Sequence, residues 1–221
     1  MKQLILDIIP APAPTLANFV AGRNGELLAA LAGLQEKTPA QARVIYVWGV
    51  PGSGKTHLSQ ACAGLGFAAL RPPFSTAAID AASACVVDQV DILDADSQHA
   101  LFDLINRQQL SGGMLLATGN CAPRDLPLRR DLASRLGSGL VFQLQPLNDG
   151  EKVEALHAHA RTRSFALRED VAAYLLRHGR RDMASLIQVL DRLDQYSLET
   201  GREITLPLLK EMTQPSLSET T

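Results

Sequence analysis

The residues with the clearest chemical role lie in the stretch GVPGSGKT, residues 49–56, which fits the spacing G-x-x-x-x-G-K-T. Its glycines allow successive backbone N–H groups to face inward and form a concave site for anions. Lys55 would reach the terminal phosphates of a nucleotide, and the Thr56 hydroxyl would ligate Mg²⁺. The residues expected to contact the nucleotide here are Pro51, Gly52, Ser53, Gly54, Lys55, Thr56 and His57.

A second oxygen ligand for the metal is expected at the end of the apolar run ACVV, where Asp88 follows. In hydrolytic enzymes with such a loop, the next residue is usually an acid that activates the attacking water. Gln89 stands there instead, and an amide can orient water but cannot take its proton at neutral pH. Asp91 is an alternative candidate for that role. The sequence predicts a site that binds Mg²⁺ and nucleotide but is poorly equipped to hydrolyse it.

Two more polar residues could act on a phosphate chain. Asn120 ends the apolar run GGMLLATGN, from where its amide could reach the γ-phosphate or the attacking water. Arg135, in DLASRLGSG, precedes a glycine-bounded turn and could point at a neighbouring molecule's nucleotide to stabilise transition-state charge. The alternatives are an ordinary loop asparagine and an ordinary surface arginine.

These residues need a parallel sheet to position them. Apolar runs alternate with helical spacing through the first two thirds of the chain, which indicates an α/β fold with helices on both faces of the sheet. Strands are expected at residues 43–48, 67–71, 83–88, 112–120 and 140–144, and helices at residues 24–37, 55–65, 97–109 and 128–136.

The last third of the chain changes to helical spacing throughout. Helices are expected at residues 149–163, 168–179, 182–201 and 206–212, with Asn148 or Asp149 capping the first and Asp182 capping the third. We therefore expect an N-terminal tail at 1–14, an α/β nucleotide-binding domain at 15–147, a small all-helical lid at 148–213 and a frayed end at 214–221.

Composition narrows the class of protein. The 221 residues carry a formal net charge of −2, which argues against a protein that coats DNA. The three cysteines have no metal-ligand or disulfide spacing, as is usual in a reducing compartment. There is no run of roughly 18 to 20 apolar residues and no signal-peptide pattern, so we expect a cytoplasmic protein without membrane contact.

The order of the motifs resembles a known family. The phosphate loop, VVDQ, LLATGN, RDLASRL and a helical lid are similar, in that order, to the AAA+ module of the bacterial replication initiator DnaA. Upstream, TLANFVAGRNGELLAAL resembles the segment of that family that lies near adenine, and it assigns Phe19, Val20 and Asn24, with Gly22, to the nucleotide. Within the family the chain resembles the Hda branch, the regulatory inactivators of DnaA. It ends after the lid, where the initiator would continue into a DNA-binding domain.

The N-terminal stretch QLILDI resembles the short motif by which such regulators dock on the sliding clamp of DNA polymerase, its β subunit. Gln3 would hydrogen-bond at the rim of the clamp pocket as part of an extended peptide. The following PAPAP would act as a stiff spacer. Leu4, Leu6 and Ile8 would fill apolar subsites of the clamp.

The resemblance implies a regulatory protein that binds ADP or ATP with Mg²⁺, docks on DNA-loaded clamp and makes ATP-bound DnaA hydrolyse its own ATP. Arg135 would act in trans as an arginine finger, Asn120 would be the sensor, and DNA would be met only through the clamp. Self-association into a homo-oligomer stays open. The alternatives are a self-sufficient AAA+ ATPase such as a helicase loader, and a DNA-binding paralogue of the initiator.

The lid departs from the family at one position. Where the family usually has a sensor arginine, this chain has Ala184, which cannot contact phosphate. Arg180 and Arg181 could substitute if the helix extended back to them, whereas a cap at Asp182 would leave both outside it. We therefore expect weak sensing of the γ-phosphate and a resting state that is ADP-bound or empty.

Overall fold

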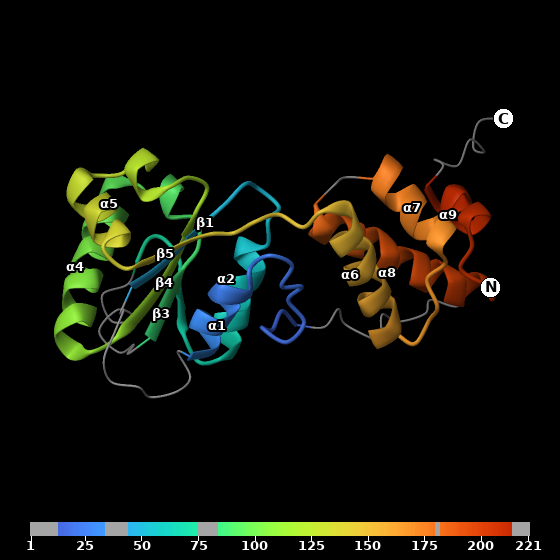
Figure 1. The fold of residues 1–221 in the computed structure, drawn as a ribbon, viewed down its shortest axis with the longest axis horizontal. Helices are drawn as coiled ribbons and strands as arrows, with labels where there is room; N and C mark the ends of the chain where they lie inside the picture. Colours follow the sequence, from blue (N-terminus) through green and yellow to red (C-terminus); the bar gives the residue numbers. More distant parts are fainter. Residues whose placement is uncertain (1–12, 34–43, 75–83, 180–181, 214–221) are drawn as a thin grey trace. The chain divides into compact units, whose positions relative to one another are not determined.

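The computed structural model of the chain describes residues 13–33, 44–74, 84–179 and 182–213. These residues fall into two compact units, Ala13–Pro146 and the part from Leu147 onward. The first unit contains a sheet with helices, and in the second all the regular structure is helical (Figure 1).

The sheet of the first unit has five strands, all parallel, in the order β2-β3-β4-β1-β5. The strands are β1 (Val44–Trp48), β2 (Ala68–Leu70), β3 (Ala84–Val87), β4 (Met114–Gly119) and β5 (Leu140–Gln143). Each lies within a run predicted from the sequence, so the parallel α/β fold is confirmed. Because β3, β4 and β1 are neighbours, the residues that follow their carboxyl ends meet at one edge. Those residues are Asp88, Asn120 and the phosphate loop.

Both faces of the sheet are covered, and the alternation of side chains along β1 shows why. Tyr46 belongs to the apolar cluster that includes Leu101 of α4 (Ala95–Ser111) and Leu132 of α5 (Arg130–Gly137). Ile45 and Val47 point to the opposite face, as successive strand residues must. That face packs against α1 (Gly25–Gly33) and α2 (Lys55–Gly64), and Figure 1 shows the two helix pairs on opposite sides of the sheet.

Helix α4 begins two residues before the predicted start because Asp94 caps it. The Asp94 side chain accepts a hydrogen bond from the Ser97 backbone N–H at 2.8 Å. The helix ends where Gly112 adopts a left-handed conformation, with φ of 77°. Two short 3₁₀ helices were not predicted: η1 (Val90–Ile92), which follows β3, and η2 (Pro123–Asp125), which follows β4.

The second unit packs four helices around a core of leucines and other apolar residues. They are α6 (Asp149–Thr162), α7 (Glu169–His178), α8 (Met183–Thr200) and α9 (Leu206–Thr213). Asn148 caps α6 in a capping box with Glu151, and Asp182 caps α8 by accepting from the Ser185 backbone N–H at 2.9 Å. Both caps confirm the predictions. None of the described helices is long and apolar enough to cross a membrane.

A buried polar cluster joins the end of α6 to α8 within this unit. Arg163 donates from Nε to Asp194 Oδ2 at 2.9 Å, and its Nη1 lies 3.4 Å from Asp191 Oδ1. His159 Nε2 lies 2.6 Å from the same Asp191 oxygen. The Arg163 and Asp194 side chains are only 10% and 12% exposed. The cluster thus pairs a nearly buried guanidinium at the end of α6 with two carboxylates of α8.

Candidate nucleotide-binding site

The loop at residues 49–56 joins β1 to α2, the strand–loop–helix context that the motif requires. Gly52 and Gly54 have φ of 78° and 107°, values that side chains with a Cβ rarely adopt. Gly54 precedes the first residue of α2, so the free N–H groups of that helix open into the loop. The Gly49 N–H donates to the Gly119 carbonyl at 3.2 Å, which fixes the loop to the end of β4.

Lys55 is buried within the loop it belongs to, with 6% of the residue exposed. Its Nζ donates to the carbonyls of Gly49 and Val50 at 2.8 and 3.0 Å. Burial lowers the pKa of this ammonium, while the negative charges of Asp88 and Asp91 oppose that shift. The cation is thus held at the loop by two neutral acceptors that phosphate oxygens can replace.

Asp88 connects the loop to β4. The Thr56 hydroxyl donates to Asp88 Oδ2 at 2.9 Å, and the Thr118 hydroxyl donates to the other carboxylate oxygen. The structure therefore brings together the two residues predicted to ligate Mg²⁺. A hydroxyl and a carboxylate are hard oxygen donors of the kind that Mg²⁺ takes alongside water and phosphate oxygens, so the residues present fit this metal.

Gln89 lies at the position where a catalytic acid would stand. It adopts a left-handed conformation with φ of 57°, and its N–H donates to the Thr118 hydroxyl at 3.1 Å. The turn brings Asp91 to Asn120. Asp91 accepts from the Asn120 side-chain Nδ2 at 2.5 Å and from the Asn120 backbone N–H at 3.2 Å. Asp91, the alternative candidate for activating water, instead uses both carboxylate oxygens to hold the predicted sensor.

The predicted adenine-side residues lie in the segment before α1. The Phe19 ring packs edge-on against the His57 ring, with centroids 5.4 Å apart, and His57 Nε2 lies 3.1 Å from the Thr15 carbonyl oxygen. Burial lowers the pKa of His57, and the contact with Thr15 opposes that shift. A Cβ added at Gly54 would meet Phe19 at 2.9 Å, so the phosphate loop and this aromatic pair are in direct contact. Val20, the next residue after Phe19, is half-buried.

Asn24 has a structural partner that the sequence did not reveal. Its Nδ2 donates to the carbonyls of Ala21 and Gln145, each at 3.0 Å, and its Oδ1 accepts from the Gln145 N–H at 2.8 Å. The residue is 5% exposed. Its amide therefore fastens the adenine-side segment to the chain just after β5.

The remaining loop residues differ in exposure. Pro51 is exposed, whereas Ser53 is buried and its hydroxyl has no hydrogen-bond partner among the residues that the structure describes. A buried hydroxyl without a partner is uncommon and costly, and it lies within the loop where a phosphate oxygen would supply one.

Arg135 lies in the last turn of α5 and is half-buried. Its Nη1 donates to Gln109 Oε1 at 3.1 Å, and its guanidinium carbon lies 5.9 Å from the centre of the Phe102 ring. Both contacts are made to α4, so the side chain is held in place by the body of the same unit.

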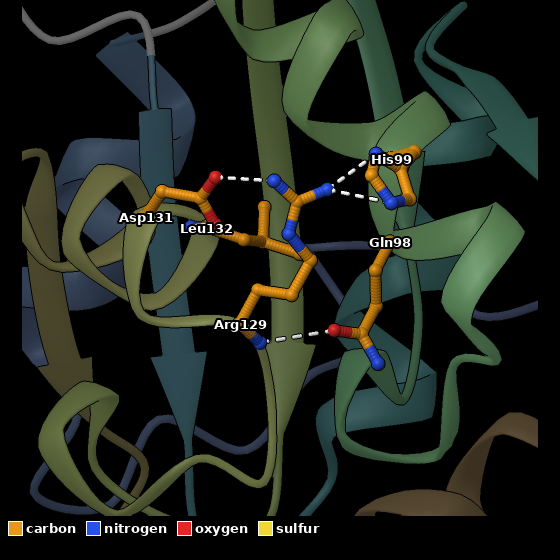
Figure 2. A network of polar contacts seen from close by, with 5 residues as sticks. All are labelled: Gln98, His99, Arg129, Asp131 and Leu132. Atoms are coloured by element: carbon orange, nitrogen blue, oxygen red, sulfur yellow. Dashed lines mark hydrogen bonds and ion pairs between the residues drawn. The ribbon is translucent and has the colours of Figure 1, made fainter.

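A second arginine, Arg129, flanks the same aromatic ring at 5.9 Å. Figure 2 shows it between α4 and the start of α5: its backbone N–H donates to Gln98 Oε1 at 3.0 Å, and its Nη2 donates to Asp131 at 2.6 Å. Its Nη1 contacts the His99 ring, 2.9 Å from Nε2. These contacts fix the entry into α5, the helix that carries Arg135.

Several predicted residues fall outside the described part of the chain. The clamp-docking residues Gln3, Leu4, Leu6 and Ile8 lie there, as do Arg180 and Arg181. Ala184 is exposed in the first turn of α8, a helix that begins at Met183 after the cap at Asp182.

Two residues of the site were missed at the sequence level. Thr118 is fully buried and joins Asp88 to Gln89, although it reads as one more residue of an apolar strand. Tyr46 donates to the Cys121 carbonyl at 2.8 Å, and Gly119 lies against its hydroxyl with no room for a Cβ. The only sequence signal for these two residues was a side-chain hydroxyl within a strand that is otherwise apolar. Such a hydroxyl indicates a buried hydrogen bond.

Comparison with known proteins gives a family match for the helical unit and a fold match for the chain. Residues 149–213 match the family model described as Hda, lid domain. Domain III of the replication initiation protein DnaA from Thermotoga maritima is similar over 92% of this chain and 100% of its own, with 22% identity and a TM-score of 0.73.

Two further structures share the fold. AMPPCP-bound DnaA from Aquifex aeolicus matches with 18% identity and a TM-score of 0.70, over 84% of this chain and 66% of its own. A single-residue variant of RuvB from Thermotoga maritima matches with 18% identity and a TM-score of 0.69, over 91% of this chain and 71% of its own. The chain thus has the fold of DnaA domain III, and its helical residues 149–213 match the Hda lid.

Proposed function

We propose that this protein is a DnaA-related regulator of replication initiation that binds an adenine nucleotide, docks on the DNA-loaded sliding clamp and stimulates ATP hydrolysis by DnaA. The observation that carries the proposal is the match of residues 149–213 to the Hda lid, attached to a phosphate-loop unit with the fold of DnaA domain III.

The nucleotide is ADP or ATP, held with Mg²⁺. Lys55 binds the terminal phosphates, and Thr56 with Asp88 holds the metal, in keeping with their mutual distance of 2.9 Å. Phe19 and His57 lie beside the loop on the adenine side. The AMPPCP-bound relative supports this choice of ligand class.

Hydrolysis in this chain's own site is weak or absent. Gln89 cannot accept a proton from water at neutral pH, and both oxygens of Asp91 are occupied by Asn120. When bound, Mg²⁺ neutralises charge on the phosphates, whereas Asp91, the alternative candidate for the base, is oriented toward Asn120 by two hydrogen bonds.

Arg135 acts on the nucleotide of DnaA. Its side chain is held against Phe102 and Gln109, so little rotamer freedom is lost when it meets a partner's phosphate. An arginine supplied in trans accelerates phosphoryl transfer by about 10³- to 10⁵-fold in other systems. The docking residues 3–8 bring this arginine to DnaA by binding the clamp, which supplies the local concentration that a weak contact needs.

A reconstituted reaction tests the proposal. With DnaA–ATP and DNA-loaded clamp, the wild-type chain raises ATP hydrolysis by DnaA and Arg135→Ala does not. Arg135→Lys keeps the positive charge but loses the forked geometry of the guanidinium, so it retains little of the stimulation of ATP hydrolysis. Arg124→Ala removes an arginine with an 87% exposed side chain from the same unit and serves as the matched control. A fully active Arg135→Ala variant would contradict the finger assignment.

Removing residues 1–8 tests the clamp contact separately. The truncated chain still binds nucleotide but gives no clamp-dependent stimulation. Stimulation that persists at the wild-type level with clamp present excludes the docking role of this segment.

A self-sufficient AAA+ ATPase, such as a helicase loader, is the second candidate. It is favoured by the intact set of Lys55, Thr56, Asp88 and Asn120 at one edge of the sheet. Steady-state ATP turnover by the purified chain alone separates the two functions. Brisk turnover without DnaA selects the ATPase, and negligible turnover selects the regulator.

A further inference from the structure

The position of Asp91 has a consequence beyond holding Asn120. Asp91 lies in η1, next to the fully buried Val90, and is brought to the edge of the sheet by the left-handed turn at Gln89. Both of its carboxylate oxygens accept hydrogen bonds from Asn120, at 2.5 and 3.2 Å. The carboxylate is therefore fixed by two contacts to one residue.

This carboxylate lies beside the start of the phosphate loop. Its Oδ1 is 3.3 Å from the place that a Cβ on Gly119 would occupy, and the Gly119 carbonyl accepts from the Gly49 N–H at 3.2 Å. Burial lowers the pKa of Lys55, and the negative charges of Asp88 and Asp91 oppose that shift. The ammonium that would meet the phosphates thus stands in the field of two carboxylates.

A bound Mg²⁺ would neutralise the first of these carboxylates but not the second. Asp88 contacts Thr56, so a bound Mg²⁺ would offset its charge. Asp91 accepts its two hydrogen bonds from the neutral amide groups of Asn120, which orient it but do not cancel its charge. A third phosphate adds negative charge at the end of the chain that Lys55 reaches, and Asn120, the predicted sensor of that phosphate, is the residue that donates to Asp91.

We propose that Asp91 sets the nucleotide preference of this site, favouring a nucleoside diphosphate over a triphosphate through like-charge repulsion of the third phosphate. The inference rests on the nucleotide-binding role proposed above and assigns its selectivity to one residue. Asp91 touches no reacting atom in this scheme. It is a specificity residue that acts through its charge and through Asn120.

Asp91→Asn tests the inference because it removes the charge, keeps the size and leaves one oxygen to accept from Asn120. Titration calorimetry with Mg²⁺ measures the dissociation constants of ADP and of the non-hydrolysable triphosphate AMPPCP. The ratio of the two constants shifts toward the triphosphate by about tenfold, the scale of one charge at a partly hydrated site. Asp96→Asn makes the same change of net charge at an exposed position in the first turn of α4 and leaves the ratio unchanged.

Asp91→Ser, a smaller neutral variant, provides the same comparison if the asparagine variant melts below the assay temperature. A ratio that stays within about twofold of wild type, or moves toward ADP, overturns the inference. If the wild-type chain binds both nucleotides and the variants leave the ratio unchanged, only this inference fails. If the wild-type chain binds neither nucleotide, the proposed function fails with it.

Discussion

Removing Asp194 should destabilise the helical unit by a large amount. Asp194 accepts from Arg163 Nε at 2.9 Å, and the two side chains are 12% and 10% exposed. Asp194→Ala leaves a nearly buried guanidinium whose remaining carboxylate partner is Asp191, at 3.4 Å. Breaking a buried ion pair from one side costs about 3–5 kcal/mol. Because Asp191 still offsets part of the charge, we expect a loss of about 3 kcal/mol in the free energy of unfolding.

Urea denaturation of the full chain measures this loss, and hydrogen exchange assigns it to α6 and α8. Two control variants test whether the loss comes from leaving a buried charge unpaired. Arg168→Ala breaks an ion pair in the same unit whose side chains are 61% and 45% exposed, and it should change stability little. Arg163→Met combined with Asp194→Leu removes both charges and should recover most of the loss, since apolar side chains replace a buried pair at little cost. A change below about 1 kcal/mol for Asp194→Ala would show that the pair behaves like a surface contact.

Three further outcomes are expected for the unit that carries the phosphate loop. Gly54→Ala should lower the free energy of unfolding by about 1–3 kcal/mol, because the φ of 107° and the Phe19 ring, 2.9 Å from where a Cβ would lie, both exclude a side chain. Urea denaturation measures this loss. An unchanged denaturation midpoint would contradict this geometry. Iodoacetamide at pH 8 should modify Cys121 and spare native Cys62, because burial raises the pKa of Cys62 to about 11. The pKa of Cys121 is raised by burial and, to a smaller extent, by the charges of Asp91 and Asp125. Asp91→Asn should therefore lower that pKa and increase the rate of Cys121 alkylation, which mass spectrometry measures. An equal rate in the variant and the wild type would show that the charge of Asp91 does not reach the thiol.

The sequence identified those parts of the molecule that depend on local patterns. The five strands follow from apolar runs flanked by turn residues, and the caps at Asn148 and Asp182 follow from short polar side chains before helical spacing. The strand order that places Asp88 beside Asn120 is not a local property. It was not predicted.

The polar pairings inside the site were beyond the reach of the sequence. Asp91 meets Asn120 because Gln89, which is not a glycine, adopts a left-handed backbone that no residue preference announces. Asn24 was expected to face the nucleotide, whereas its amide hydrogen bonds go to Ala21 and Gln145, the latter far along the chain. Such pairings depend on which segments tertiary packing brings together, and spacing along the chain does not record that.

The hydrogen bonds of Asn24 also fasten the last residues of the first unit. Besides the Asn24–Gln145 pair, the Arg23 guanidinium donates to the Pro146 carbonyl at 3.2 Å. The backbone that leaves β5 is therefore anchored through Pro146, the last residue of the unit. Since Phe19 lies on the same segment, the aromatic ring beside the phosphate loop and the backbone that leaves β5 belong to one hydrogen-bonded part of the first unit.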